Sequence, residues 1–401
     1  MKFLYIFTDL DIGGIETLIL RSARWLNSNG HQVNLVVSRG GELLSEVSKY
    51  ASVNVVGKLK YHSCGLPFIR NIYRDDFDII HAFSYDSTWL GAQISQDTGS
   101  KLIVGVYHPQ AFGFFEGYPP HFIRKYFQLF NSLPEENILF MNIPTKKEHE
   151  KYYKKDFNKS RILPLPIDNI NDNRLLDRNP ITKPYKIISV GRLVDFKVYH
   201  FGVIDVIKRM VGENIDIEYY IYGDGRLRNE LQEYIESQGL TSNVFLMGEV
   251  EYSKFHKEIK DGYIFLGMGT SLAEAAMMGI PSLAMPTWEK SGLTYGLFHS
   301  LEDYSLGEQG KSKSVYDEIK NLITMDKKDY LSVCEIEKQA AANYSTDYVM
   351  GLYLRYCSEL NDISYIPSFS ESLAVISSRF INTKIPYFKN KLVRQDLRYK
   401  M

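Results

Sequence analysis

Residues 262–281 read GYIFLGMGTSLAEAAMMGIP, and the order of the parts of this stretch is typical of one class of fold. An apolar run with the composition of a buried strand comes first, and a helical pattern follows after a short glycine-containing connection. Strands that alternate with helices in this way build parallel α/β sheets. We expect Thr270 or Ser271 to be the N-cap of the helix, where free backbone amides and the helix dipole favour a phosphate.

Glu274 is the single carboxylate of this stretch, and we expect it on the first turn of the helix. At that place it could reach a vicinal diol. In a purely structural alternative, Thr270 and Ser271 only cap the helix and Glu274 faces nothing.

The same alternation of apolar runs and helical patterns extends over most of the chain and predicts two Rossmann-like, doubly wound domains that face a cleft. The runs expected as strands in the first domain are 3–7, 33–38, 53–56, 78–83, 101–107 and 137–142, and a helix is expected over 15–29. The runs expected as strands in the second domain are 185–191, 217–225, 244–248, 262–267 and 281–286. Because such sheets bind ligands at the carboxyl ends of their strands, we expect the site in the cleft between the domains.

The polar stretch 168–184 has little periodicity and carries prolines, which favours an interdomain linker. The predicted organisation is a first domain over 1–170, a linker over 171–184, a second domain over 185–346, a helix over 347–364 that returns towards the first domain, and a tail over 365–401.

The tail has an unusual composition, because 379–401 holds seven basic residues against one acidic residue, Asp396, with interleaved Phe and Tyr. This composition fits an interfacial anchor for anionic lipid. It equally fits a solvated basic tail whose aromatic residues pack on the protein, and the sequence leaves both open.

Bulk composition excludes several classes of protein. The chain has 401 residues, 44% hydrophobic and 24% charged, and a formal net charge of −1, which argues against nucleic acid as a partner. Its three cysteines have no metal-binding spacing, so we expect them to be reduced. The apolar run at the start lacks a cleavage site and no run is long enough to span a bilayer, so we expect a cytoplasmic location.

A second motif, ISVGRLVDFKVYHFGVIDVI (188–207), places Arg192 and Lys197 between a strand and a helix. Two cations at the carboxyl end of a strand can converge on a diphosphate, Arg through its planar fork and Lys as a point charge. Taken alone, such a pair is more often surface charge. Further along, Gly223-Asp224-Gly225 turns the chain after another strand, where backbone could approach a flat base.

Taken in order and spacing, these motifs resemble the donor domain of GT-B glycosyltransferases of family four: strand-Gly-Arg-(x4)-Lys, then the YGDG turn (222–225), then E-A-(x3)-G-I-P ending at Pro281. The first half agrees, since Gly13-Gly14-Ile15-Glu16, DIIH (78–81) and LPLPID (163–168) resemble motifs of the same family. The resemblance covers about residues 1–360.

The resemblance implies retaining sugar transfer from a nucleotide diphosphate sugar without a cofactor or an obligatory metal. Arg192 and Lys197 would neutralise the leaving diphosphate, and Glu274 would hold the ribose hydroxyls. His108 resembles a histidine near the reacting sugar, although a histidine at a strand end is as often structural. The donor-binding residues that the resemblance implies are Gly13, Gly14, Gly223, Val250, Gly267, Gly269, Thr270, Ser271 and Glu274.

The chain departs from the family at the first glutamate of its Glu-(x7)-Glu pair, because Leu266 stands eight residues before Glu274. In the family that glutamate is implied to contact the transferred sugar. Its absence leaves the identity of the sugar open; backbone amides of the loop or the Thr270 hydroxyl could replace it.

We expect transfer of a hexose or N-acetylhexosamine to a carbohydrate or lipid-linked carbohydrate acceptor in bacterial surface polysaccharide assembly, with peripheral contact to the inner membrane face through 379–401. Two other functions stay open: a non-catalytic nucleotide-sugar-binding subunit, and a GT-B sugar-nucleotide epimerase.

Asp9-Leu10-Asp11 is a D-x-D pattern that could suggest a metal site. The run GGIETL lacks the G-x-G-x-x-G pattern of a dinucleotide dehydrogenase.

Overall fold

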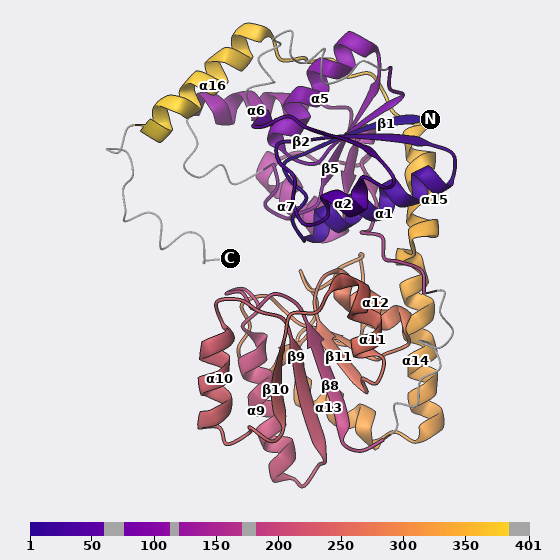
Figure 1. The fold of residues 1–401 in the computed structure, drawn as a ribbon, viewed down its shortest axis with the longest axis vertical. Helices are drawn as coiled ribbons and strands as arrows, with labels where there is room; N and C mark the ends of the chain where they lie inside the picture. Colours follow the sequence, from indigo (N-terminus) through magenta and orange to yellow (C-terminus); the bar gives the residue numbers. More distant parts are fainter. Residues whose placement is uncertain (60–75, 113–119, 171–181, 385–401) are drawn as a thin grey trace. The chain divides into compact units, whose positions relative to one another are not determined.

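The computed structural model describes residues 1–59, 76–112, 120–170 and 182–384, and they form two compact units (Figure 1). Unit 1 consists of 1–141, 145–163 and the part of the chain after 352. Unit 2 consists of 142–144 and 164–352. Most of the predicted linker, Cys64 and the tail beyond 384 lie outside the described residues.

Unit 1 contains a parallel sheet of seven strands in the order β3-β2-β1-β4-β5-β6-β7. Its strands are β1 Lys2–Phe7, β2 Gln32–Val37, β3 Ser52–Val55, β4 Ile79–Ala82, β5 Lys101–Val106, β6 Ile138–Phe140 and β7 Arg161–Ile162. Its helices are α1 Gly14–Ser28, α2 Leu44–Val47, α5 Tyr85–Thr98, α6 Pro120–Ser132, α7 Ile143–Tyr153 and α16 Phe369–Lys384. α1 is followed by Gly30 at a φ of +78°, a left-handed conformation that glycine adopts without strain.

Unit 2 contains a parallel sheet of five strands in the order β10-β9-β8-β11-β12. Its strands are β8 Tyr185–Val190, β9 Ile217–Tyr222, β10 Val244–Gly248, β11 Ile264–Gly267 and β12 Ser282–Ala284, with a separate hairpin of β13 Leu293–Thr294 and β14 Lys313–Ser314. Its helices are α9 Tyr199–Gly212, α10 Arg228–Ser237, α11 Phe255–Ile259, α12 Thr270–Met277, α13 Val315–Thr324 and α14 Lys327–Ala341. α15, Thr346–Cys357, begins in unit 2 and ends in unit 1.

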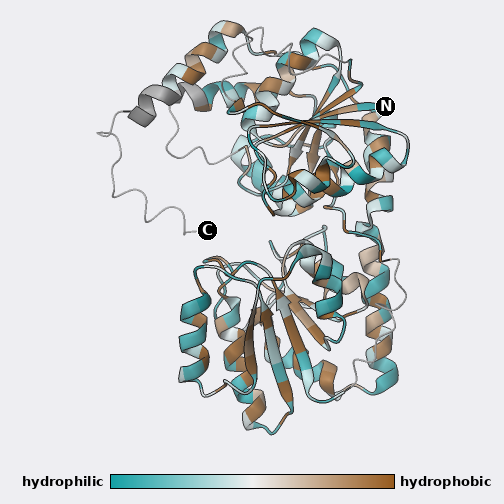
Figure 2. Cartoon of the chain, viewed as in Figure 1, coloured by the Kyte–Doolittle hydropathy of each residue, from teal (hydrophilic) through white to brown (hydrophobic). Residues whose placement is uncertain are grey.

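Both sheets confirm the predicted fold class, two Rossmann-like α/β domains. In unit 2, α9 packs with α10 and α13, while α12 packs with α11 and α14, so the helices form two groups. Apolar residues concentrate on the strands and polar residues on the outer faces of the helices, as expected for parallel sheets that are covered on both sides (Figure 2). No helix in the described ranges combines the length and apolar character needed to cross a membrane.

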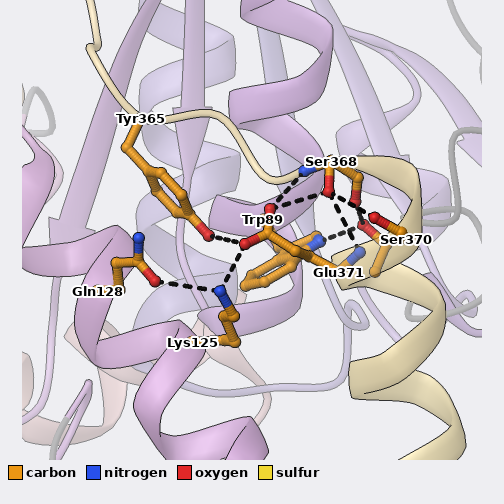
Figure 3. A network of polar contacts seen from close by, with 8 residues as sticks. Trp89, Lys125, Gln128, Tyr365, Ser368, Ser370 and Glu371 are labelled. Carbon is orange, nitrogen blue, oxygen red and sulfur yellow. Dashed lines mark hydrogen bonds and ion pairs between the residues drawn. The ribbon is translucent and has the colours of Figure 1, made fainter.

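The helix α16 is held on unit 1 by a network of polar contacts (Figure 3). Nε1–H of Trp89 donates to Oγ of Ser372 at 2.8 Å, and Nε2 of Gln93 donates to the same oxygen at 3.0 Å. Glu371 forms an ion pair with Lys125 of α6 at 2.5 Å. The helix α16 is therefore packed on α5 and α6 through specific contacts.

The strand order of unit 2 brings together the ends of the strands that carry the predicted motifs. β8 pairs with β9 on one side, through Val190 and Tyr222, and with β11 on the other, through Ile188 and Phe265. The residues that follow β8, β9 and β11 therefore lie at one edge of this sheet.

Candidate active site

The loop after β8 places the two predicted cations at this edge. Gly191 has a φ of +157°, and a Cβ built on it would lie 2.4 Å from Nζ of Lys197. The ammonium group of Lys197 therefore occupies the space that a side chain at position 191 would need. The backbone conformation favours glycine at this position, whereas the ammonium group is the end of a flexible side chain.

Arg192 and Lys197 are two cations near each other without a counter-ion. Arg192 is exposed and Lys197 is half-buried, and within the described part of the chain no carboxylate pairs with either side chain. Burial first, and the charge of Arg192 second, lower the pKa of Lys197 to about 8. Such an arrangement is electrostatically unfavourable until an anion binds.

The loop after β9 supports the cation loop through its backbone. A Cβ on Gly223 would lie 2.0 Å from the carbonyl oxygen of Gly191, and one on Gly225 would lie 2.3 Å from that of Leu193. The N–H of Leu193 donates to the carbonyl of Asp224 at 2.8 Å. Glycines at these positions are thus required by the close approach of the two loops. A contact of Gly223 with the base of a nucleotide stays a prediction.

A buried polar chain lies beneath the site. Oγ of Ser189 donates to the carbonyl of Leu266 at 2.8 Å and lies 2.8 Å from the hydroxyl of Tyr219, which is 2.7 Å from Nδ1 of His200. Burial, and then the charge of Lys197, lower the pKa of His200 to about 3, so its ring is neutral. These contacts join β8, β9, β11 and α9.

The helix α12 begins one residue earlier than expected, and its N-cap is Gly269, not Thr270 or Ser271. Gly269 has a φ of +70° and a ψ of −156°, a conformation that is open mainly to glycine, and no side chain caps the helix. Oγ of Ser271 instead lies 3.2 Å from the carbonyl of Met268 and 3.4 Å from that of Val190, to which it donates. The start of α12 therefore adjoins the end of β8, next to Arg192.

Gly267 is the last residue of β11, and its carbonyl accepts the N–H of Met285 at 2.8 Å. Thr270 is half-buried at the first position of α12. The sheet edge that carries Arg192 and Lys197 therefore also carries the predicted residues of the next loop, which are Gly267, Gly269, Thr270 and Ser271. Val250 is half-buried just after β10.

Glu274 lies in the second turn of α12, not in the first, because the helix starts at Thr270. It is only 4% exposed. Oε2 of Glu274 lies 3.4 Å from Nε2 of His256 on α11, within ion-pair range when the imidazole is protonated. That nitrogen is buried and has no hydrogen-bond partner among the described residues.

Leu266 is fully buried in β11 and belongs to the core of unit 2, where it pairs with Leu283 of β12. β11 continues to Gly267, so the chain reaches the sheet edge only after position 266. The position at which the family carries its first glutamate is here part of a core strand.

The predicted residues of unit 1 lie on that unit's own loops. Gly13 is the N-cap of α1, and a Cβ on Gly14 would meet no heavy atom within 4 Å, so the space around Gly14 is open. His108 is exposed after β5, and its Nδ1 accepts the N–H of Gln110 at 3.0 Å. A neutral His108 ring therefore carries its proton on Nε2, from which it could donate to a ligand.

The two carboxylates of the D-x-D pattern, Asp9 and Asp11, both form ion pairs with Arg39. His81, at the end of β4, is buried between the hydroxyls of Tyr107 and Tyr353, at 3.0 and 3.1 Å. Both segments are thus held by contacts within unit 1.

Two residues near the site were not singled out from the sequence. His256 lies on a five-residue helix and belongs to no motif. Trp288 is 45% exposed after β12, and its backbone N–H donates to the carbonyl of Phe196 at 2.9 Å, beside Lys197. Its φ of +62° is uncommon for a residue other than glycine.

Comparisons with known proteins match the chain to two glycosyltransferase family models. The family described as Glycosyltransferase Family 4 matches residues 12–169, and that described as Glycosyl transferases group 1 matches residues 172–289. The uncharacterized glycosyltransferase MJ1059 of Methanocaldococcus jannaschii is 28% identical over 174 residues. That match spans 40% of this chain and 41% of the length of the relative.

Solved structures share the fold. Anabaena Alr3699/HepE in complex with UDP aligns with a TM-score of 0.68 and 14% identity over 90% of this chain and 100% of that one. The same protein has been solved with UDP-glucose, and this structure aligns with a TM-score of 0.64. A glycosyltransferase from Rickettsia africae aligns with a TM-score of 0.67 and 16% identity over 89% of this chain and 98% of that one.

Proposed function

The chain belongs to family 4 of the glycosyltransferases, whose members have the GT-B fold, and we propose that it transfers a sugar from a nucleotide diphosphate sugar to an acceptor with retention of configuration. The observation that carries this proposal is the pair Arg192 and Lys197, two cations without a described counter-ion beside the start of α12. A diphosphate would neutralise both and meet the free amides of the helix.

In the proposed reaction, the bond between the anomeric carbon of the donor sugar and the diphosphate oxygen breaks. The acceptor hydroxyl oxygen bonds to the same carbon on the same face, and its proton passes to the departing phosphate oxygen. Arg192 and Lys197 stabilise the negative charge that develops on the leaving group. His108 lies on unit 1, and we assign to its Nε2–H a hydrogen bond with a hydroxyl of the reacting sugar.

Glu274 is the proposed partner of the ribose hydroxyls, and the remaining donor contacts are assigned to Gly13, Gly14, Gly223, Val250 and the loop 267–271. The donor is a hexose or N-acetylhexosamine nucleotide. Because a fold relative was solved with UDP-glucose, UDP-sugars are the first donors to test.

For the acceptor we propose a carbohydrate or lipid-linked carbohydrate in bacterial surface polysaccharide assembly, which places the enzyme at the inner face of the membrane. The basic composition of 379–401 supports this location.

The test begins with a thermal-shift panel of nucleotide sugars, because a ligand that binds only the native state raises its stability. Transfer or slow hydrolysis of the stabilising donor is then followed by mass spectrometry. Arg192→Ala and Lys197→Ala should each lower turnover by roughly a hundredfold. Unchanged turnover in both variants would reject the site.

The two alternatives have their own signatures. Nucleotide binding without turnover of any donor would favour the non-catalytic subunit. Conversion of UDP-N-acetylglucosamine in the absence of an acceptor would reveal an epimerase.

A further inference from the structure

The loop after β12 brings an exposed tryptophan to the edge of the sheet that carries the cations. β12 pairs with β11, and the N–H of Met285 donates to the carbonyl of Gly267 at 2.8 Å, so the two strands reach this edge together. Trp288 follows in the same loop and is 45% exposed. Its backbone N–H donates to the carbonyl of Phe196, the residue before Lys197, at 2.9 Å. The loop after β12 is thus tied to the cation loop.

The segment after Trp288 is packed tightly on α9. A Cβ built on Gly202 would lie 2.3 Å from the backbone nitrogen of Gly292 and 2.5 Å from the carbonyl oxygen of Lys290. The carbonyl of Gly292 accepts the N–H of Val315 at 2.9 Å. The loop is therefore held both at the cation loop and at α9, which gives the indole a defined place.

The backbone conformation of Trp288 is unusual for its residue type. Its φ of +62° lies in the left-handed region, which is unfavourable for a residue with a large side chain. Such conformations persist where surrounding contacts impose them, and they concentrate at ligand-binding sites. The acidic neighbour, Glu289, accepts hydrogen bonds from the backbone N–H and the hydroxyl of Ser291. Nζ of Lys290 lies 5.0 Å from the ring centre of Phe201. Trp288 is the large apolar side chain that this loop exposes.

The strand order decides which part of a nucleotide sugar would meet Trp288. The strands follow one another as β10-β9-β8-β11-β12, so the end of β12 is next to that of β11. The proposed function assigns the base to the turn after β9 and the diphosphate to the loops after β8 and β11. Because neighbouring strands are about 4.8 Å apart, β12 lies three spacings, about 14 Å, from β9. The sugar, which is bonded to the far end of the diphosphate, is therefore the part of the donor within reach of Trp288.

We propose that the indole of Trp288 stacks on the pyranose ring of the donor sugar and helps to select that sugar. One face of a pyranose presents C–H groups, and an aromatic ring that covers this face removes apolar surface from water. Binding of the diphosphate by Lys197 brings the sugar ring next to the indole. The inference rests on the proposed function, and it adds a residue that recognises the sugar and not the nucleotide.

The test compares UDP-glucose and UDP-N-acetylglucosamine with UDP, because UDP lacks the sugar. Isothermal titration calorimetry measures the three dissociation constants for the wild type and for Trp288→Gly. The affinity for the UDP-sugars should fall about tenfold in the variant, whereas the affinity for UDP should change by less than about twofold. Glycine is the replacement because it adopts a φ of +62° without strain. Trp288→Phe keeps an aromatic ring and should retain most of the affinity for the sugars.

Tryptophan fluorescence gives a second readout that does not depend on turnover. The chain contains three tryptophans, and Trp288 is 45% exposed whereas Trp89 is 1% exposed. The emission that is lost in Trp288→Phe should shift to shorter wavelength with a UDP-sugar and not with UDP, because the sugar shields the indole from water. The matched control is Tyr348→Ala on α15, since Tyr348 is 43% exposed and lies in unit 2. This variant should bind all three ligands as the wild type does.

The outcomes separate this inference from the proposed function. Equal losses of affinity for UDP and the UDP-sugars in Trp288→Gly would assign the indole to the base and overturn the proposal. Unchanged affinities with a raised KM for the acceptor would also overturn it, because the indole would then hold the acceptor. A wild-type protein that binds none of the three ligands would refute the proposed UDP-sugar site itself, and the inference with it. Circular dichroism establishes that each variant is folded.

Discussion

Lys197 provides the sharpest prediction, because replacing it with methionine should stabilise the free protein. The ammonium group is half-buried, lies over Gly191 and is close to Arg192, without a described counter-ion. Methionine retains most of the length of the side chain and removes the charge. A residue that costs stability in the empty protein is expected at a site that binds an anion.

The magnitude follows from the pKa. The folded-state pKa of Lys197 is about 8, below the ordinary 10.5, so the folded protein binds this proton more weakly than the unfolded chain does. One pKa unit corresponds to about 1.4 kcal/mol, which gives an upper limit of about 3 kcal/mol at pH 7. Solvent screening of a half-buried group reduces this, and we expect about 1–3 kcal/mol.

The pH dependence has a defined direction. A lysine with a lowered folded-state pKa destabilises the folded state most below pH 8, where it is charged in both states. The penalty fades as the pH rises from 8 towards 10.5, since the folded protein releases the proton first. The advantage of Lys197→Met over the wild type should therefore shrink across this window.

Scanning calorimetry measures the effect, with Lys208→Met as the control because Lys208 is exposed on α9. Each kcal/mol should shift the transition of unit 2 by roughly 2–4 °C. Saturating UDP, at about 100 times its dissociation constant, should add about 2.7 kcal/mol to the wild type and much less to Lys197→Met. A Lys197→Met protein that is less stable than the wild type at pH 7 would refute the electrostatic account of the site.

Three further predictions concern other parts of the chain. Glu371→Gln should release α16 at neutral pH, seen as faster hydrogen exchange of its amides; in the wild type the same release should appear as the pH falls from 4.5 through about 2, because the contact with Lys125 lowers the pKa of Glu371. His256 lies beside Glu274 and is expected to hold it in place, so His256→Ala should raise the KM for the donor by about tenfold with little change in kcat. His256→Gln should restore part of the loss, and a change in kcat alone would contradict this role. Leu266→Glu should destabilise unit 2 by about 3 kcal/mol or more, measured by calorimetry, instead of restoring a sugar contact, because it would bury an unpaired carboxylate.

The strands and the cation loop could be predicted from the sequence because their signals are local. Apolar runs of four to six residues bounded by turns identify buried strands such as β8 and β11. The placement of Arg192 and Lys197 follows once a strand ends before them. The sequence of the adjacent strand is enough to predict where these two cations lie.

The start of α12 was predicted one residue too late for a physical reason. Thr270 and Ser271 are good capping residues, and capping preference alone favours them. The backbone at Gly269, with φ +70° and ψ −156°, instead excludes other residues, and Gly269 is tied by its N–H to the carbonyl of Leu306 at 2.8 Å. A partner 37 positions along the chain, 306 against 269, gives no local signal.

His256 and α16 were missed for related reasons. A histidine on a five-residue helix carries no periodicity, and its approach to Glu274 depends on how α11 packs on α12. The composition of the tail predicts only that 379–401 is basic. The docked helix α16 depends on contacts with Trp89 and Lys125, nearly 300 and 250 residues earlier in the chain.

Because Leu266 stands in place of a carboxylate, the protein is expected to donate hydrogen bonds to the sugar at this place, not to accept them. A glutamate accepts hydrogen bonds from sugar hydroxyls, whereas backbone N–H groups at the start of α12 can only donate. Leu266 cannot turn outwards, because β11 pairs on both sides, with β8 and β12, and its side chain is fully buried. We therefore expect the site to favour sugars that offer an acceptor to this loop, such as the carbonyl oxygen of an N-acetyl group. Competition between UDP-glucose and UDP-N-acetylglucosamine for the same site measures this preference, and tighter binding of UDP-glucose would show that the loop amides do not replace the carboxylate.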